Sequence, residues 1–167
     1  MNLGRLAEDQ LGRGESRLRD AERAYREQRW PDALRFSQEA VELALKALLR
    51  AMAVEVPKRH DVGPALQMVA ATLPSEIRRR LPGMIDLSSE LADRRALAMY
   101  GDEVGGRTAG DLFRSRTEAQ RYLTGSRELV ALVARHLRVR RGSSPRGRSR
   151  RATARGARGN DAPAATR

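Results

Sequence analysis

The segment from Pro31 to Val54 constrains the fold most strongly, because its apolar residues recur with the period of an α-helix. At about 100° per residue, they cover well over half of the helix circumference. The apolar arc comprises Ala33, Phe36, Ala40, Val41, Ala44, Leu45, Ala47, Leu48, Ala51 and Met52. The narrow polar stripe holds Arg35, Glu39, Glu42 and Lys46, which are spaced for the ion pairs Arg35–Glu39 and Glu42–Lys46. A helix with so little polar surface must be covered on most sides, so the pattern predicts a central, mostly buried helix.

Helical patterns also fill most of the chain on either side of this segment, and no period-two strand pattern competes with them. We expect further helices over residues 3–28, 62–73, 83–99 and 117–137. Pro74 and Pro82 bracket an expected basic turn over residues 75–81, and the glycines in residues 100–106 mark a loop. The short connections predict an all-α, up-down bundle of four to five helices within residues 1–137.

The composition excludes several classes of protein. Without cysteine, the chain can form no disulfide, no thiolate metal site and no cysteine nucleophile. Its longest uncharged run, residues 62–75, is too short to cross a membrane, and Met1 opens onto a polar stretch rather than a secretory signal. We therefore expect a cytoplasmic protein without a membrane partner. The adjacent carboxylates Asp102 and Glu103 lack further ligand types nearby, so no metal site and no cofactor are predicted.

Most of the net charge belongs to the C-terminal segment, residues 138–167. The chain carries +12, of which +9 comes from the ten arginines and the single acid, Asp161, of this segment. Because it has almost no large apolar residues to offset the entropy lost on ordering, we predict a disordered tail. Such arginine-rich segments are typical of nonspecific phosphate binding, and the alternative is a solubilising end without a partner. The candidate nucleic-acid contacts are Arg140, Arg141, Arg146, Arg148, Arg150 and Arg151.

Arg95 is the candidate binding residue that the helical pattern singles out. On the helix expected over residues 83–99, it falls within the apolar arc of Met84, Leu91 and Ala98. A guanidinium keeps its charge and needs a partner when buried, which predicts a carboxylate, a phosphate or a subunit interface at this position. The alternatives are a structural salt bridge, or a packed stem whose charged head reaches water.

Arg94, Tyr100 and Asp102 complete the candidate ligand site. Arg94 borders the same arc, although it is also spaced to pair with Glu90. Tyr100 and Asp102 follow at the helix end, where a loop could present them beside Arg95. For Asp102 the alternative is a capping or turn role.

Three short segments carry motifs in a fixed order: residues 40–49 (AVELALKALL), residues 59–62 (RHDV) and residues 95–102 (RALAMYGD). They resemble, in turn, the Ala-x-Glu-x-x-Leu-Lys-Ala-Leu helix, the His-Asp-apolar step and the Arg-rich helix end before Tyr-Gly/Pro-Asp of the HEPN family (higher eukaryotes and prokaryotes nucleotide-binding). The resemblance spans residues 18–137. It implies a homodimeric helical bundle that handles RNA or nucleotides, often paired with a nucleotidyltransferase as toxin and antitoxin.

The chain departs from the ribonuclease members of that family at their catalytic motif. In those members an Arg is followed after four to six residues by a His, so that His moves a proton while Arg steadies the phosphate charge. Neither His60 nor His136 has an arginine at that spacing, and the matching position after Arg95 is Tyr100, a phenol that keeps its proton near neutral pH. No catalytic residue is therefore predicted, and the histidines are expected to be capping or boundary residues.

The favoured hypothesis is a noncatalytic, RNA- or nucleotide-binding HEPN-like protein of a toxin–antitoxin-like system, with a nucleotidyltransferase as its partner. One alternative is a divergent ribonuclease toxin that uses Arg95 and Tyr100. Another is a dimeric protein-interaction module whose tail supplies all of the nucleic-acid affinity.

Overall fold

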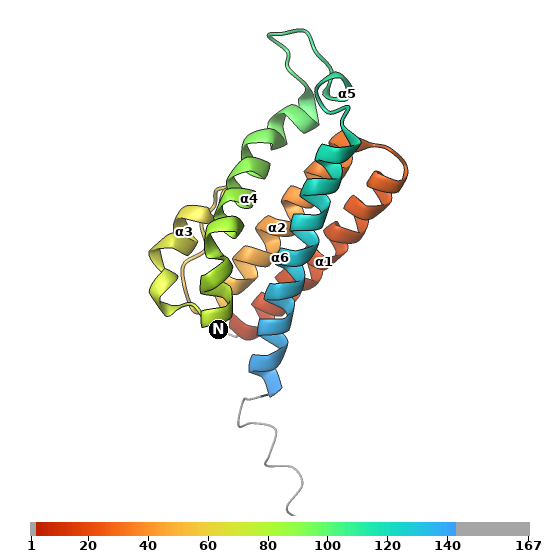
Figure 1. Ribbon diagram of the computed structural model, residues 1–167. Coiled ribbons are helices and arrows are strands. Elements are labelled where there is room, and N and C mark those ends of the chain that lie inside the picture. Colours follow the sequence, from red (N-terminus) through yellow and green to blue (C-terminus); the bar gives the residue numbers. More distant parts are fainter. Residues whose placement is uncertain (1–2, 143–167) are drawn as a thin grey trace, which may run out of the picture.

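The computed structural model describes residues 3–142, which form a bundle of helices (Figure 1). The long helices are α1 (Leu3–Arg26), α2 (Trp30–Ala51), α4 (Ser75–Tyr100) and α6 (Arg116–Gly142). The short elements are α3 (Gly63–Met68), the 3-10 turn η1 (Ala70–Thr72) and α5 (Ala109–Leu112). No strand occurs in the described residues, and the predicted all-α class is confirmed. None of these helices combines the length and the apolar character that crossing a membrane requires.

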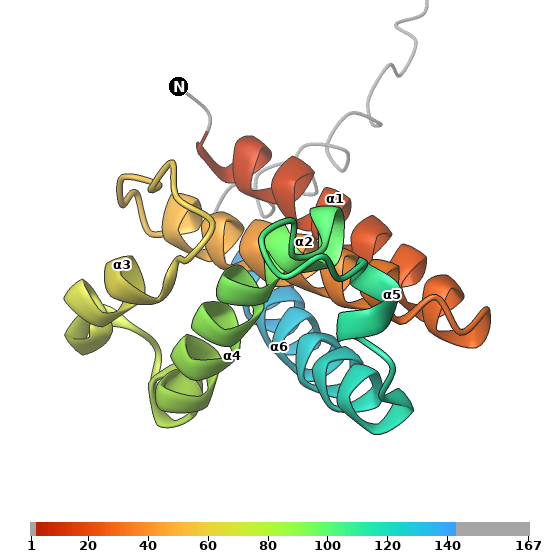
Figure 2. The ribbon, with the colours of Figure 1, turned by 90° about the horizontal axis from the view of Figure 1, so that it is seen from above.

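α2 lies at the centre of the bundle, as its apolar pattern predicts. Viewed from above, it runs between α1 on one side and α4 and α6 on the other (Figure 2). Leu45, Leu48 and Leu49 have no exposed surface. Each fully buried leucine contributes about 1.5–3 kcal/mol to folding. α2 therefore supplies the shared apolar surface against which the other long helices pack.

Small residues let α1 approach α2 closely. A side-chain carbon added at Gly14 would lie 3.2 Å from the backbone oxygen of Ala40, which is tighter than an ordinary contact. Ala21 and Ala24 on α1 are fully buried. Gly14 therefore serves the packing of two helices and does not interrupt α1.

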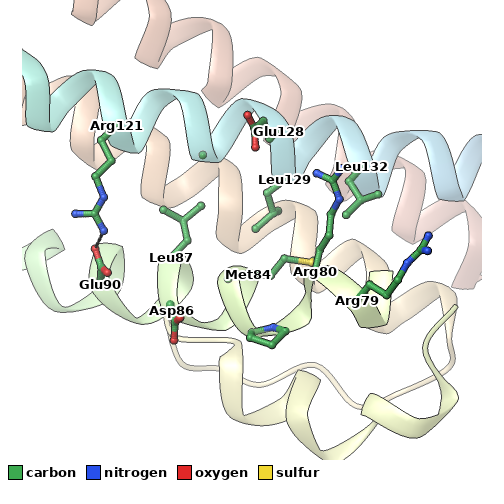
Figure 3. A pocket seen from close by; sticks show the side chains of 13 residues that line it. Arg79, Arg80, Met84, Asp86, Leu87, Glu90, Arg121, Glu128, Leu129 and Leu132 are labelled. Atoms are coloured by element: carbon green, nitrogen blue, oxygen red, sulfur yellow. Dashed lines mark hydrogen bonds and ion pairs between the residues drawn. The ribbon is translucent and has the colours of Figure 1, made fainter. Parts of the chain in front are cut away.

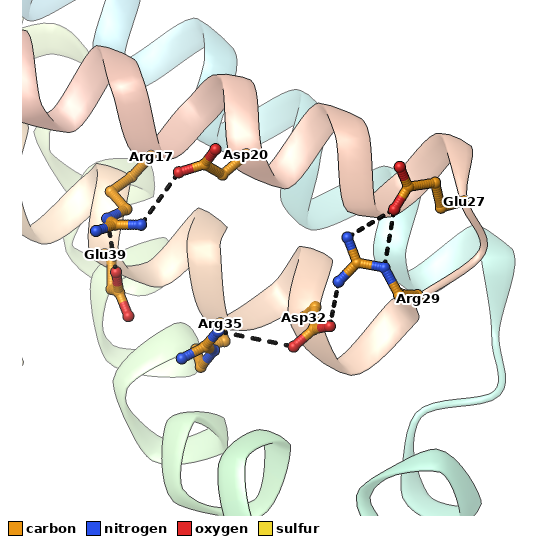
Figure 4. A network of polar contacts seen from close by, with 7 residues as sticks. All are labelled: Arg17, Asp20, Glu27, Arg29, Asp32, Arg35 and Glu39. Carbon is orange, nitrogen blue, oxygen red and sulfur yellow. Dashed lines mark hydrogen bonds and ion pairs between the residues drawn. The ribbon is translucent and has the colours of Figure 1, made fainter.

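Ion pairs line the exposed margin between α1 and α2 (Figure 4). Arg17 on α1 lies 3.1 Å from Glu39 on α2. The Arg35–Glu39 pair expected from helical spacing is therefore wrong, because Glu39 reaches across to the neighbouring helix and Arg35 lies 3.8 Å from Asp32. Exposed pairs of this kind contribute little to stability, about 0–1 kcal/mol each.

Residues 75–81 form the first turns of α4 and not the basic turn that the flanking prolines predicted. Ile77 and Leu81 lie one helical turn apart and are 0% and 5% exposed. Packing of this apolar pair outweighs the local signal from Pro82, which lies inside the helix at the loss of one backbone hydrogen bond. As a result, α4 runs along the whole bundle (Figure 1).

α6 ends at Gly142 and so includes the first five residues of the segment predicted to be a disordered tail. Leu137, at the predicted helix end, is 8% exposed and anchors α6 to the core. Extending an anchored helix through arginines is favourable, because arginine is a good helix former. Arg140 and Arg141 lie at the end of α6, whereas Arg146, Arg148, Arg150 and Arg151 lie outside the described residues.

Candidate phosphate-binding site

Arg95 lies near the C-terminal end of α4 and contacts α2. Its side chain is half-buried, as the helical pattern predicts, and its Nε donates a hydrogen bond to Oε1 of Gln38 at 3.0 Å. The partner is thus a neutral amide and not a carboxylate. Within residues 3–142, the two terminal amino groups of Arg95 have no hydrogen-bond or ion-pair partner. The guanidinium is fixed at one edge, and its charge and other donors stay available.

Gln38 connects Arg95 to a carboxylate on α2. Its side chain is 2% exposed, and its Nε2 donates to Oε2 of Glu42 at 2.8 Å. Sequence reasoning missed Gln38, because a lone glutamine on a helix carries no charge pattern. The signal that could have found it is its place on the helical wheel, between the buried residues Leu45 and Leu49.

Glu42 accepts hydrogen bonds from three side chains. Besides Gln38, its carboxylate accepts from Nζ of Lys46 at 2.7 Å and lies 3.0 Å from Nδ1 of His60. Burial by itself would raise the pKa of Glu42, but the hydrogen bonds from Lys46, Gln38 and His60 outweigh it and lower the pKa below its ordinary value. The Glu42–Lys46 pair predicted from spacing is confirmed, although both side chains are largely buried.

The segment that follows α2 ties α2 to α4. His60 reaches back to α2, whereas Oδ1 of Asp61 accepts from the backbone N–H of Gly63 at 2.9 Å and from the hydroxyl of Ser88 at 3.1 Å. The hydroxyl of Ser89 donates to the other carboxylate oxygen of Asp61 at 3.2 Å. This brace fixes α2 against α4, the two helices that hold the candidate site.

Arg94 belongs to the interface between α4 and α6. Its Nη1 lies 3.0 Å from Oε1 of Glu118, and its guanidinium carbon lies 5.6 Å from the centre of the Tyr122 ring. Glu90, the partner that helical spacing offered, instead pairs with Arg121 and accepts from the Tyr122 hydroxyl at 3.1 Å. The charge of Arg94 is therefore already matched by a carboxylate.

Tyr100 and Asp102 lie beyond the arginines, at the end of α4. Tyr100 is 70% exposed and lies about 140° further around the helix than Arg95. The carboxylate of Asp102 accepts from the N–H of Gly105 at 2.9 Å and lies 3.4 Å from Arg107, and these contacts lower its pKa. They close the loop that projects beyond the bundle in Figure 1. The structure thus favours the turn role for Asp102 and brings neither residue into contact with Arg95.

The axes of α4 and α6 diverge (Figure 2). Between these helices lies a groove that no sequence pattern indicated (Figure 3). It has a volume of about 560 Å³, and its floor includes the apolar side chains of Met84, Leu87 and Leu129. Arg79 and Arg80 stand at one end (Figure 3). The groove arises from the angle between two helices, which periodicity along one chain does not encode. None of the predicted ligand residues lines it.

The described residues assemble no metal centre, since no group of three His, Asp or Glu side chains among residues 3–142 is placed to hold an ion. The two histidines lie on separate elements, with His60 before α3 and the half-buried His136 on α6. The groups that do come together are a half-buried guanidinium and a buried amide. This arrangement suits the binding of an anion.

Comparison with known proteins identifies the same family that the motifs in α2 and α4 resemble. The family model of the HEPN domain matches residues 7–137, a range that runs from α1 into α6. No curated protein and no solved structure matches the chain significantly. The family match covers most of the 167-residue chain. The chain therefore belongs to the HEPN domain family.

Proposed function

We propose that this chain is a noncatalytic HEPN-domain protein that binds the phosphate groups of a nucleotide or of RNA through Arg95. One observation carries the proposal: a neutral amide holds the half-buried guanidinium through Nε, and its terminal amino groups are unpaired within the described residues. A guanidinium can meet phosphate oxygens with two parallel hydrogen bonds. Partial burial strengthens such a contact, because water screens it less.

The other predicted ligand residues would have supporting roles. Arg94 adds a second positive charge on the same helix, reduced in effect because Glu118 already pairs with it. Tyr100 offers an exposed ring on which a base could stack. Asp102 would act indirectly, by shaping the loop that follows Tyr100.

The surroundings of Arg95 support the proposal that the protein is noncatalytic. A ribonuclease needs a proton acceptor beside the group that steadies the phosphate. Nδ1 of His60 contacts Glu42, and Tyr100 lies about 140° around α4 from Arg95. We therefore expect RNA to stay intact during long incubation with concentrated protein. Cleavage that disappears in the Arg95→Ala variant would instead establish the divergent ribonuclease.

The assembly that we propose is a homodimer that acts with a nucleotidyltransferase in a toxin–antitoxin-like pair. Membership of the HEPN family supports this proposal. Light scattering coupled to size-exclusion chromatography measures the mass of the particle. The mass of a monomer at micromolar concentration would contradict the proposed dimer. Copurification with the product of the neighbouring gene tests the partner.

Substitution of Arg95 tests the binding site directly. We expect Arg95→Ala to weaken binding of ADP to the full chain about tenfold, the loss of one charge-assisted contact to phosphate. The control is Arg78→Ala, which removes an exposed arginine near the other end of α4, outside the lining of the groove, and should leave the affinity unchanged. Equal affinities of the wild type and Arg95→Ala would refute the assignment of Arg95.

The tail-only alternative makes a different prediction. If residues 143–167 supply all of the affinity, deleting them should abolish ADP and RNA binding, whereas Arg95→Ala should have no effect. Under our proposal, the shortened protein keeps its ADP affinity and loses it when Arg95 is substituted. The deletion starts after Gly142, because α6 extends to that residue.

A further inference from the structure

Gln38 and Glu118 hold two neighbouring half-buried arginines of α4, Arg95 and Arg94, in different ways. We propose that Gln38 is a positioning residue of the Arg95 site: it fixes the guanidinium with a neutral acceptor, so that the charge of Arg95 stays uncompensated until a phosphate binds. The inference rests on the proposed function of Arg95. Elsewhere, Arg94 contacts a carboxylate directly, 3.0 Å from Glu118, and the charge of such an arginine is already compensated.

The orientation of the Gln38 amide follows from its two partners. The carboxylate of Glu42 accepts hydrogen bonds, so Nε2 of Gln38 must face it, at 2.8 Å. The guanidinium of Arg95 only donates, so Oε1 must face Nε, at 3.0 Å. Rotating the amide by half a turn would break both hydrogen bonds in a place that is 2% exposed. Gln38 therefore has one stable orientation, and that orientation fixes the guanidinium.

Glu42 holds the far end of this arrangement without neutralising Arg95. Its carboxylate already binds Lys46 at 2.7 Å and His60 at 3.0 Å, and both of its oxygens are used. The contacts run in the order Lys46, Glu42, Gln38 and Arg95, whose side chains are positive, negative, neutral and positive. The negative charge of Glu42 is thus matched by Lys46, and Gln38 separates it from Arg95.

Arg50 provides a comparison within the same molecule. Its Nε donates to Oε1 of Gln10 at 2.6 Å, the same type of contact that Arg95 makes. Gln10, however, is only half-buried, and within the described residues no second side chain holds its amide. Gln10→Glu places a carboxylate against an arginine of α2, as the exchange does at Arg95, but far along α2 from the Arg95 contact. It is therefore a matched control.

The test exchanges the amide and the carboxylate on α2. The double variant Gln38→Glu with Glu42→Gln keeps the net charge, keeps an acceptor for Arg95 and keeps an acceptor for Lys46, so we expect it to fold. The charge of Arg95 is now met by the carboxylate introduced at position 38. We expect binding of ADP to the full chain to weaken about tenfold, whereas Gln10→Glu should leave it unchanged.

The readout is the Nε–Hε resonance of Arg95, assigned by its absence in Arg95→Ala and followed while ADP or inorganic phosphate is added. An exchanged variant with wild-type affinity would overturn the inference and leave the role of Arg95 standing. If ADP shifts no Arg95 resonance in the wild type, the proposed function fails, and the role of Gln38 fails with it.

A second variant avoids any new charge. Gln38→Met keeps the volume of the side chain and removes the acceptor, so Arg95 loses its tether but not its charge. We expect the Arg95 resonance to sharpen and ADP affinity to fall about threefold. Unchanged affinity together with an unchanged resonance would also refute the inference, whether or not the exchanged variant folds.

Discussion

The two sides of α4 meet their neighbouring helices in different ways. Toward α2 and the segment that follows it, Arg95 contacts Gln38 and Ser88 contacts Asp61. Leu91, one turn before Arg95, has no exposed surface. Toward α6 the helix axes diverge, a groove opens, and the ion pair between Glu90 and Arg121 lies exposed at its margin. α2 therefore determines where α4 lies, whereas the α6 side leaves space that a ligand or partner could use.

We expect the two sides of α4 to differ most in how much the free energy of unfolding falls when a leucine is truncated. Leu91→Ala creates a cavity on the buried side and should lower the free energy of unfolding by about 2–5 kcal/mol. Leu87→Ala removes a half-buried side chain that lines the groove, so we expect less than half of that loss. Chemical denaturation of both variants measures the difference. Equal losses would mean that the two sides of α4 do not differ in packing.

The pH dependence of stability tests the polar contacts on the side of α4 that faces α2, which involve Glu42. Because the pKa of Glu42 is lower in the folded protein than its ordinary value of 4.5, the unfolded chain binds the proton more readily. The contribution of the Glu42 carboxylate is thus fully present above pH 4.5 and is lost as the pH falls through its folded pKa.

The measurement compares the wild type with Glu42→Gln. The difference between their unfolding free energies should be constant above pH 4.5 and shrink below it. Glu128→Gln, at an exposed residue of α6, is the control and should show no such change. A difference that is constant down to pH 3 would contradict the role given to the three donors around Glu42.

The smallest effect is expected at the glycines. Nothing lies within 4 Å of a side-chain carbon added at Gly83 in α4, so Gly83→Ala should stabilise the helix by about 0.5–1 kcal/mol. Gly14→Ala offers the contrast, since the added carbon would lie 3.2 Å from the backbone oxygen of Ala40, and we expect a loss of stability. Thermal unfolding measures whether each substitution raises or lowers the melting temperature. A loss of stability in Gly83→Ala would contradict the open space around Gly83 on the groove side of α4.

Periodicity predicted the central elements well. The apolar arc of residues 31–54 gave the position and burial of α2, and the wheel of α4 placed Arg95 on its half-buried side. Both inferences rest on one helix at a time. Local signals failed at residues 75–81, because the burial of Ile77 and Leu81 is a tertiary contribution that outweighs a proline.

The candidate site could be predicted only in part. Arg95 was identified, but its partner Gln38 lies 57 residues earlier on another helix, and a single sequence contains no information on such a pair. The Glu42–Lys46 pair followed from spacing, yet its burial and the contact with His60 depend on how the segment after α2 returns to it. Arg94 and Tyr100 share a helix with Arg95 but face elsewhere.

The amide that touches Arg95 has an evolutionary consequence. Codons for glutamine and glutamate differ by one base, so a single nucleotide substitution at Gln38 would place a carboxylate against the guanidinium without adding or removing a heavy atom of the side-chain skeleton. The anion binding that we propose at Arg95 would then be lost while the bundle kept its shape. If the proposal holds, the residue aligned with Gln38 would distinguish HEPN domains whose arginine is free to bind an anion from those in which a carboxylate already neutralises it.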